Sequence, residues 1–160
     1  MERDARGLWL VWFLSGLIVF MIFLPVISAK FGYFWLGDFA YLAFKPFCHQ
    51  LPERSFDLLG RELGVCARCL GIYLGIFFGL SFFLLSKRSP TRLILFPIFF
   101  MISDGLLNGL GIIDSGNIIR MVLGLGFGIA SGWLLGYGII DLERILKVEF
   151  KGRWRIRNIT

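Results

Sequence analysis

The sequence has few charged residues for its length. Of its 160 residues, 17 are Lys or Arg and 11 are Asp or Glu, which is 18%, whereas about 25% is usual in soluble domains. Hydrophobic residues make up 57%, and 20 glycines add to the apolar share. This composition excludes a disordered chain and argues against a soluble globular domain. The length leaves room for one domain, or two at most.

The charges are absent from four long windows. Residues 8–28, 64–86, 93–113 and 118–140 hold only three charged side chains between them. Each window is long enough for a helix to cross the roughly 30 Å hydrocarbon core, and in lipid a helix satisfies its own backbone hydrogen bonds. The sequence therefore predicts an all-α polytopic membrane protein. Residues 1–160 form a single integral membrane domain, a bundle of four transmembrane helices.

The first window has to be distinguished from a signal peptide. Arg3 and Arg6 precede it, as basic residues precede a signal peptide, but its 21 apolar residues exceed the roughly 7–15 of a typical signal. We therefore expect an uncleaved helix with a kink near Pro25.

Lys and Arg are unevenly divided between the two sides of the predicted bundle. The side that holds the N-terminus, the 87–92 turn and the basic tail 141–160 carries 11, and the opposite side carries six. Because Lys and Arg collect in cytoplasmic connections, both termini of this multi-pass cell-membrane protein are predicted to be cytoplasmic. The net charge of +6 thus indicates orientation, and no motif for nucleic-acid binding accompanies it.

The long connection 29–63 is predicted to be extracytoplasmic. Eight aromatic residues lie between Phe31 and Phe47, and aromatic rings favour the headgroup level of the bilayer. This favours a short interfacial or re-entrant helix, with a plain core-packing stripe as the alternative. Further along, Ser55 and Asp57 are suited to the first turn of another short helix.

The three cysteines and the only histidine are clustered. They lie within 22 residues, as Cys48-His49 followed by Cys66-x-x-Cys69. Three thiolates and one imidazole form a complete tetrahedral ligand set for zinc, and a site closed by four protein ligands is structural rather than catalytic. The sequence therefore predicts a zinc site of Cys48, His49, Cys66 and Cys69 at the outer membrane face.

Basic residues accompany this cluster. Zinc with three thiolates carries one net negative charge, which Arg54 or Arg68 is close enough in sequence to compensate. Cys66 also lies near the start of a predicted helix, where free amide groups lower the pKa of a thiol. A thiolate at Cys66 suits both a metal ligand and a redox nucleophile.

Redox chemistry is the main alternative to the metal. A membrane thiol-disulfide oxidoreductase would use Cys66 and Cys69 with Cys48 as the resolving thiol, outside the cytoplasm where disulfides persist. The second cysteine pair that such relays generally need is absent. A static disulfide and inert thiols also stay open, although an odd number of cysteines argues against a pure disulfide framework.

Polar residues interrupt the third and fourth windows. Asp104 and Asn108 share one helix face, and an ionised carboxylate inside the membrane costs about 2.5–3.5 kcal/mol unless it is paired. Arg120 is one candidate partner, although Asp114 offers it another. These residues form either an interhelical clamp or the polar path of a transporter or channel component along Asp104, Asn108 and Arg120.

Glycines recur every four residues in three of the windows. Such spacing lets helix backbones approach closely, either within one chain or between copies in a homo-oligomer. The rows are Gly71, Gly75 and Gly79, then Gly105 and Gly109, then Gly124, Gly128, Gly132 and Gly136.

The polar motifs together resemble a known family. The residues that carry the resemblance are Cys48-His49-Gln50, Pro52, Arg54-Ser55-Phe56 and the run from Cys66 to Tyr73, CARCLGIY. This pattern is similar to that of the DUF2085 family, small predicted membrane proteins of unknown function, over residues 40–130. The resemblance groups these residues but implies no activity, substrate or cofactor, so the zinc prediction rests on ligand chemistry.

Overall fold

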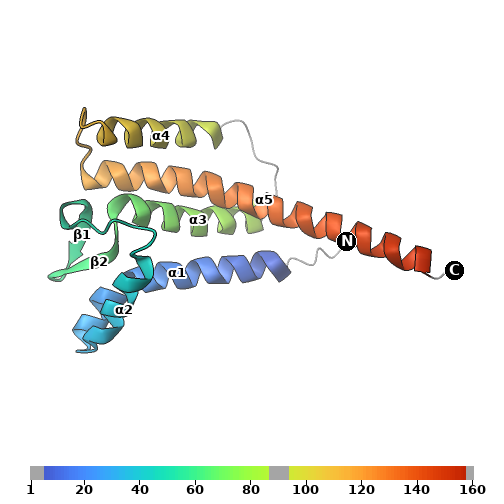
Figure 1. Ribbon diagram of the computed structural model, residues 1–160, viewed down its shortest axis with the longest axis horizontal. Coiled ribbons are helices and arrows are strands. Elements are labelled where there is room, and N and C mark those ends of the chain that lie inside the picture. Colours follow the sequence, from blue (N-terminus) through green and yellow to red (C-terminus); the bar gives the residue numbers. More distant parts are fainter. Residues whose placement is uncertain (1–5, 87–93, 158–160) are drawn as a thin grey trace.

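The chain is mostly helical, and its longer helices lie side by side along its long axis (Figure 1). The computed structural model describes residues 6–86 and 94–157. Its helices are α1 (Arg6–Lys30), α2 (Phe34–Phe44), α3 (Ala67–Ser86), α4 (Leu95–Gly109) and α5 (Asn117–Arg157). A 3-10 turn η1 (Pro52–Arg54) and two strands, β1 (Ser55–Leu58) and β2 (Arg61–Cys66), separate α2 from α3. The predicted basic turn 87–92, the start of the third window at 93 and the ends of both termini lie outside the described residues.

Three of the described helices are long and apolar enough to cross a membrane. They are α1, α3 and the Asn117–Lys147 part of α5. Helix α4 has 15 described residues, or about 22 Å, which is less than the roughly 30 Å of the hydrocarbon core. It ends at Gly109, four residues before the predicted end, because the chain turns back through Gly111 at a φ of 70°. We predicted four membrane spans, and among the described residues three helices are long enough to cross a membrane.

A β-hairpin occupies the segment for which we expected a helix. Strands β1 and β2 pair antiparallel, with Ser55 opposite Cys66, so the all-α prediction is wrong here. Leu59 and Gly60 both adopt positive φ, as a two-residue hairpin turn requires. Asp57 accepts a hydrogen bond from the Gly60 amide at 2.9 Å and thus stabilises the turn rather than a helix. Helix α3 consequently begins at Ala67 instead of residue 64.

The hairpin and α2 cover the end of the bundle away from the termini (Figure 1). Strand β2 buries Leu63 and Val65 in a core cluster with Ile22 of α1 and Phe44 of α2. Helix α2 confirms the predicted short helical segment, and it exposes large aromatic side chains such as Trp35 and Phe39. This arrangement fixes one end of the bundle through apolar packing.

Helix α5 continues through most of the predicted basic tail. Residues 142–147 are good helix formers, so the helix extends to Arg157 instead of ending near residue 140. The Gly7 amide, at the start of α1, donates to Glu143 Oε1 at 3.1 Å. The start of α1 and the later part of α5 therefore lie at the same end of the molecule (Figure 1).

Two of the glycine rows meet each other within one chain. A Cβ atom on Gly75 of α3 would lie 2.7 Å from the Gly128 Cα of α5, and one on Gly128 would lie 2.8 Å from the Gly75 Cα. Only glycine allows this backbone approach. Around Gly105 and Gly109 of α4, by contrast, a Cβ would meet no described atom within 4 Å. The glycine rows of α3 and α5 thus pack against each other within one chain, and neither row needs a second copy of the protein as its partner.

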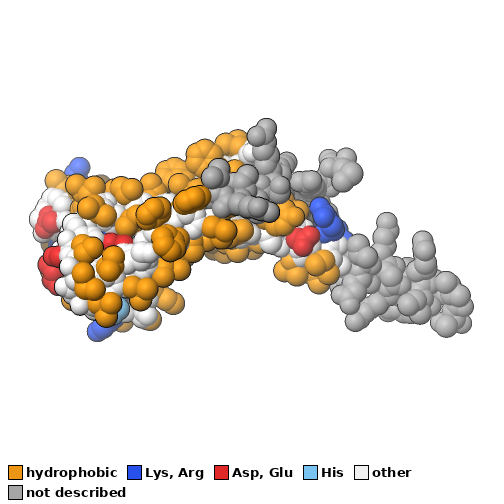
Figure 2. All heavy atoms as spheres, turned by 90° about the horizontal axis from the view of Figure 1, so that it is seen from above, with side chains coloured by type: hydrophobic (Ala, Val, Ile, Leu, Met, Phe, Trp, Pro, Cys, Tyr) orange, Lys and Arg blue, Asp and Glu red, His pale blue; other side chains and the backbone are white. Residues whose placement is uncertain are grey.

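Hydrophobic side chains cover the face of the molecule seen in Figure 2, and the acidic and basic groups lie toward its two ends. Large exposed apolar residues occur along α1, α4 and α5. Such a band suits contact with lipid.

Candidate metal centre

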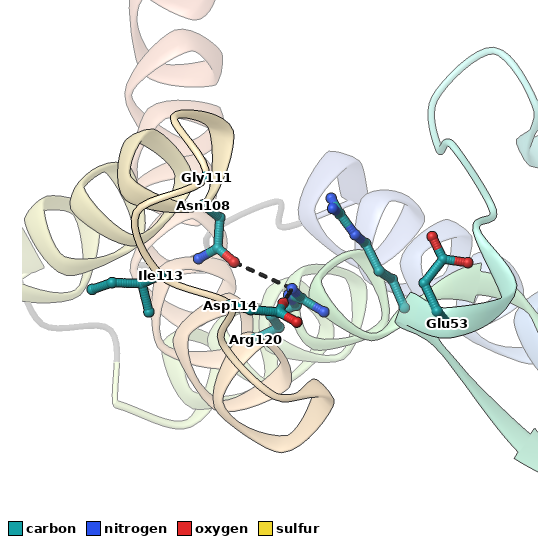
Figure 3. A pocket seen from close by; sticks show the side chains of 7 residues that line it. Glu53, Asn108, Gly111, Ile113, Asp114 and Arg120 are labelled. Atoms are coloured by element: carbon teal, nitrogen blue, oxygen red, sulfur yellow. Dashed lines mark hydrogen bonds and ion pairs between the residues drawn. The ribbon is translucent and has the colours of Figure 1, made fainter.

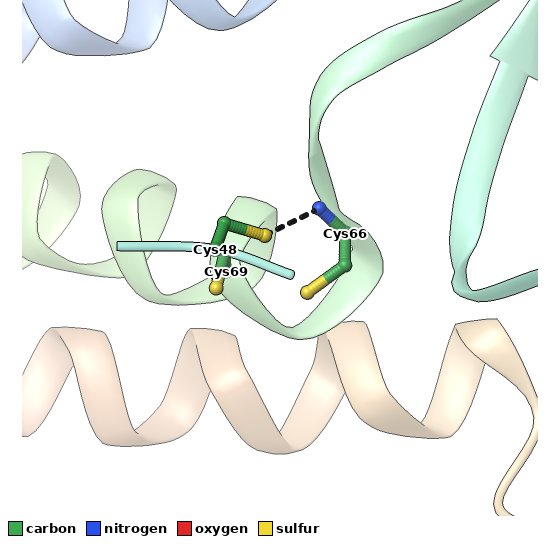
Figure 4. Close-up of side chains that lie close together, drawn as sticks. All are labelled: Cys48, Cys66 and Cys69. Atoms are coloured by element: carbon green, nitrogen blue, oxygen red, sulfur yellow. Dashed lines mark hydrogen bonds between the residues drawn. The ribbon is translucent and has the colours of Figure 1, made fainter. Parts of the chain in front are cut away.

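Three chain segments bring the three cysteines together. Cys48 follows α2, Cys66 ends β2, and Cys69 lies in the first turn of α3. Their sulfur atoms all lie within 4.8 Å of one another (Figure 4). The Cys66 amide donates to Cys48 Sγ at 3.2 Å, and all three cysteines are free thiols within the described part of the chain. The hairpin creates this cluster, because it returns the chain from Cys48 to Cys66.

Hydrogen bonds hold the Cys48 segment against both α2 and β2. The Cys48 amide donates to the Phe44 carbonyl at 2.9 Å. Gln50 adopts a φ of 49°, and its side-chain amide donates to the carbonyls of Tyr41 at 2.9 Å and Gly64 at 2.8 Å. Cys48 is buried in the same core cluster as Phe44. Its position is therefore set by local hydrogen bonds and packing.

His49 lies beside the cluster but not in it. Its side chain is exposed and lines the pocket that the cysteines also line. Among the described residues, the group of ligand atoms within 4.8 Å contains the three cysteines and not His49. Three of the four predicted ligands are thus brought together, and a role for His49 stays a prediction.

Cys66 is the cysteine best suited to carry a negative charge. The thiols of Cys48 and Cys69 hydrogen-bond to it and lower the pKa of Cys66 well below that of an ordinary thiol. Its place directly before α3 adds the free amide groups of a helix start. The lowered pKa favours the thiolate form of Cys66, which suits metal binding or nucleophilic attack.

The cysteines open onto a pocket of about 220 Å³. All charged side chains that line it are arginines: Arg54, Arg68 and Arg120. We predicted the first two as support for the site; both line this pocket, and their supporting role stays a prediction. Arg120 was expected among the intramembrane polar residues alone, so the structure joins that group to the cysteine site.

The carboxylate of Asp104 has a different partner from the one expected. Its side chain is only 9% exposed and forms an ion pair with Arg68 of α3. It also accepts hydrogen bonds from the Ser115 hydroxyl at 2.5 Å and the Asn108 amide at 2.9 Å. Arg120 is not among its partners, so the first of our two pairings is wrong.

Arg120 instead pairs with Asp114, as the alternative pairing predicted. The two groups lie 2.5 Å apart, and Arg120 also donates to the side-chain oxygen of Asn108 at 3.2 Å (Figure 3). Its remaining partner is Asn117 at 3.3 Å. Asn117 in turn donates to the Ser55 carbonyl at 3.3 Å, so the network reaches from the α4–α5 turn to the hairpin.

A second pocket of about 240 Å³ adjoins this network (Figure 3). It is lined by Glu53, Arg54, Asn108, Gly111, Ile113, Asp114 and Arg120. Arg54 and Arg120 therefore line both pockets and form the wall that the two share.

Two contributors were not predicted as site residues. Ser115 lies in the α4–α5 turn and Asn117 begins α5, and no spacing rule points to their partners. The Arg68–Asp104 pair had a usable signal, since these are the only charges in the second and third apolar windows and their signs are opposite.

The comparisons with known proteins give this site a family. Residues 48–134 match a family model described as predicted membrane protein (DUF2085). This chain belongs to the DUF2085 family. The matched part begins at Cys48 and includes the cysteines, the hairpin, α3, α4 and the Arg120 network, whereas α1 and α2 precede it.

Two archaeal relatives are similar to this DUF2085 protein over most of their length. An uncharacterized protein of Methanocaldococcus jannaschii is 31% identical over 129 residues, covering 71% of this chain and 83% of the relative. An uncharacterized protein of Methanothermobacter thermautotrophicus is 36% identical over 92 residues, covering 55% of this chain and 83% of the relative. No solved structure matches the chain.

Proposed function

We propose that this DUF2085 protein is an integral membrane protein that binds zinc through Cys48, Cys66, Cys69 and His49 at the outer membrane face. The convergence of three sulfur atoms within 4.8 Å carries the proposal. Tetrahedral coordination at a Zn–S distance of about 2.3 Å puts thiolates about 3.8 Å apart, so only a small contraction is needed. The lowered pKa of Cys66 favours the thiolate that a metal requires.

His49 supplies the fourth ligand in this proposal. It neighbours Cys48 in the chain and lines the same pocket, so a rotation of its side chain toward the sulfur atoms completes the set. A site with four protein ligands is structural. Bound zinc would then join the end of α2, the hairpin and the start of α3.

The membrane arrangement is part of the same proposal. Helix α4 makes a fourth crossing with α1, α3 and α5, and both termini face the cytoplasm. Support comes from the common end at which α1 begins and α5 continues and from the excess of Lys and Arg on that side. The exposed aromatic residues of α2 suit the outer headgroup layer.

A thiol-disulfide oxidoreductase is the second candidate, and the lowered pKa of Cys66 favours it. The Cys66 thiolate would attack a substrate disulfide, and Cys69 or Cys48 would displace the second substrate thiol. The products are a reduced substrate and one disulfide in this chain. A transport path receives less support, because Asp104, Asn108 and Arg120 bind one another and neighbouring groups, as an interhelical clamp does.

Metal analysis and thiol counting separate the two main candidates. Purified protein should contain about one zinc ion per chain, and chelation should unmask thiols that resist alkylation before it. Cys48→Ser should lose the metal, whereas Lys45→Ala, an exposed change three residues away, should keep it. Metal-free protein with a reducible Cys66–Cys69 disulfide would contradict the zinc proposal and favour the redox candidate.

His49 has its own test. His49→Ala should weaken zinc binding without abolishing it, because three thiolates remain. Zinc affinity equal to that of the wild type would remove His49 from the ligand set while leaving the cysteine site in place.

A further inference from the structure

We propose that the wall formed by Arg54 and Arg120 binds a phosphate group, either the headgroup phosphate of a lipid or a soluble phosphate. The two arginines line both pockets. Glu53 and Asp114 also line the second pocket, so the cysteine pocket is the one suited to an anion. The inference goes beyond the zinc proposal, because it depends on the arginines and not on the sulfur atoms.

The charges around the cysteine pocket favour an anion. Besides the cysteine cluster, its charged lining residues are three arginines, and no carboxylate from the described residues lines it. The three positive charges exceed the single negative charge of a Cys66 thiolate. Arg68 and Arg120 have partners in Asp104 and Asp114, which lie outside this lining. Within the described part of the chain, Arg54 forms no ion pair. Arg54 is thus the cation left for a ligand.

The partner of Arg120 neutralises it only in part. The Arg120 side chain is 7% exposed, whereas that of Asp114 is 93% exposed. Water therefore screens the carboxylate far more than the guanidinium, and exposed carboxylates contribute little to such pairs. Inside the pocket, the carboxylate of Asp114 therefore offsets the positive charge of Arg120 only partly, and a bound anion interacts with the remainder.

The geometry of the donors suits phosphate. A guanidinium group presents a planar fork of N–H donors that matches two phosphate oxygens. Arg54 offers such a fork, whereas the terminal nitrogens of Arg120 already donate to Asp114, Asn108 and Asn117, so Arg120 contributes mainly its buried positive charge. Arg68 is better placed to interact with the cysteine cluster than with the ligand. It lies between Cys66 and Cys69 in the chain, and its Nε is a buried donor without a described acceptor. We therefore assign Arg68 to the negative charge of the metal–thiolate group and the shared wall to the ligand.

The place of the pocket suits a ligand with an apolar part. Phe47 and Leu51 line it beside the arginines, and Phe47 is exposed. Arg68 and Arg120 lie in the first turns of α3 and α5, both of which are candidate membrane spans. The ends of such spans lie at the level of the lipid phosphates, where a headgroup and a soluble phosphate both have access.

Full-length protein in nanodiscs tests the proposal in two arms. In phosphatidylcholine discs, inorganic phosphate is titrated and binding is followed by calorimetry. In the second arm, protein from discs containing phosphatidylglycerol is released in a native mass spectrometer, and the retained lipid is counted. Binding in the first arm identifies a soluble source, and retention of phosphatidylglycerol alone identifies a lipid source.

Arg54→Gln should weaken binding in the responding arm about tenfold or more, since it removes a charge-assisted contact. Arg61→Gln is the matched control: it removes the same charge from the hairpin that follows Arg54, but Arg61 lies over the Phe34 ring, 5.0 Å from its centroid, and lines neither pocket. Arg54→Lys should retain part of the affinity, because it keeps the charge and loses the fork.

Two results would overturn the proposal: no binding in either arm, or equal losses in Arg54→Gln and Arg61→Gln. Zinc content, measured on the same samples, keeps the two proposals apart. Phosphate binding without zinc would support the phosphate proposal and contradict the zinc proposal. Zinc without phosphate binding would contradict the phosphate proposal and leave the zinc proposal intact.

Discussion

Arg68 and Asp104 form an ion pair that joins the first turn of α3 to the C-terminal half of α4. Helix α4 has no fully buried residue of its own among those described. Its firm attachments are polar and lie near the cysteine site: Asp104 binds Arg68, and Asn108 binds Arg120. The same arginines line the cysteine pocket, so the position of α4 and the chemistry of the pocket share two side chains.

Replacing Asp104 should therefore destabilise the protein. Asp104→Asn leaves the Arg68 guanidinium without its counter-charge and should lower the free energy of unfolding by about 1.5–3 kcal/mol, typical of a hydrogen bond to a charged group. Denaturant unfolding in detergent measures this change. Asp141→Asn is the control: Asp141 and Arg144 are 3.7 Å apart and mostly exposed, so the loss there should be small.

The double variant sharpens the same prediction. Arg68→Gln with Asp104→Asn removes both charges, so it should cost less than the sum of the single changes. Additive costs would show that the pair contributes no coupling and that α4 is attached by other contacts.

The helices and the cysteine grouping follow directly from the sequence. Long windows with few charges have few structural solutions in lipid, and all three cysteines with the sole histidine fall within one short segment. The hairpin did not follow, because Ser55 and Asp57 suit a helix start as well as a turn. Whether this segment forms a helix or a hairpin depends on Leu59 and Gly60, which accept positive φ. It also depends on Leu63 and Val65, which become buried only when α1 and α2 pack against β2.

The polar pairings were only partly predictable for a similar reason. In the predicted span 93–113, Asp104 lies near the middle. Helix α4 ends at Gly109, which brings Asp104 closer to the hairpin end and within reach of Arg68. The depth of a residue in a helix therefore depends on a turn that forms through Gly111 and Ser115, and the hydropathy window does not reveal it.

The contact between α3 and α5 should tolerate no added atom where Gly75 meets Gly128. Gly75→Ala places a Cβ 2.7 Å from the Gly128 Cα, and backbone atoms cannot move aside as side chains do. We expect a loss of about 1–3 kcal/mol in unfolding free energy, as for other overpacked sites. Unfolding in detergent tests this.

Gly105→Ala is the matched control for that change. It makes the same substitution in α4 where no described atom lies within 4 Å of the new Cβ, so it should be neutral or slightly stabilising. Equal losses in the two variants would indicate that glycine is needed for helix flexibility rather than for close approach. A loss in Gly105→Ala alone would point to a contact between copies on α4.

Removing zinc should loosen the hairpin end of the bundle. If the cysteines hold a structural metal, chelation releases the end of α2, β2 and the start of α3 from one another, and the melting temperature falls. Each kcal/mol lost corresponds to about 2–4 °C for a chain of this size. Cys69→Ser, which lacks a ligand, should melt lower from the start and respond little to chelator. An identical chelator response in both proteins would place the metal elsewhere.

The reactivity of Cys66 should depend on its two neighbours. Hydrogen bonds from Cys48 and Cys69 lower the pKa of Cys66, so in metal-free protein its thiolate should persist to a lower pH than that of an ordinary thiol. Cys48→Ala removes the largest of these contributions, so the pKa should rise and alkylation of Cys66 at a given acidic pH should slow. The pH profile of iodoacetamide labelling, read from the Cys66 peptide by mass spectrometry, measures this shift. An unchanged profile in Cys48→Ala would mean that the start of α3, and not the neighbouring thiols, sets the pKa of Cys66.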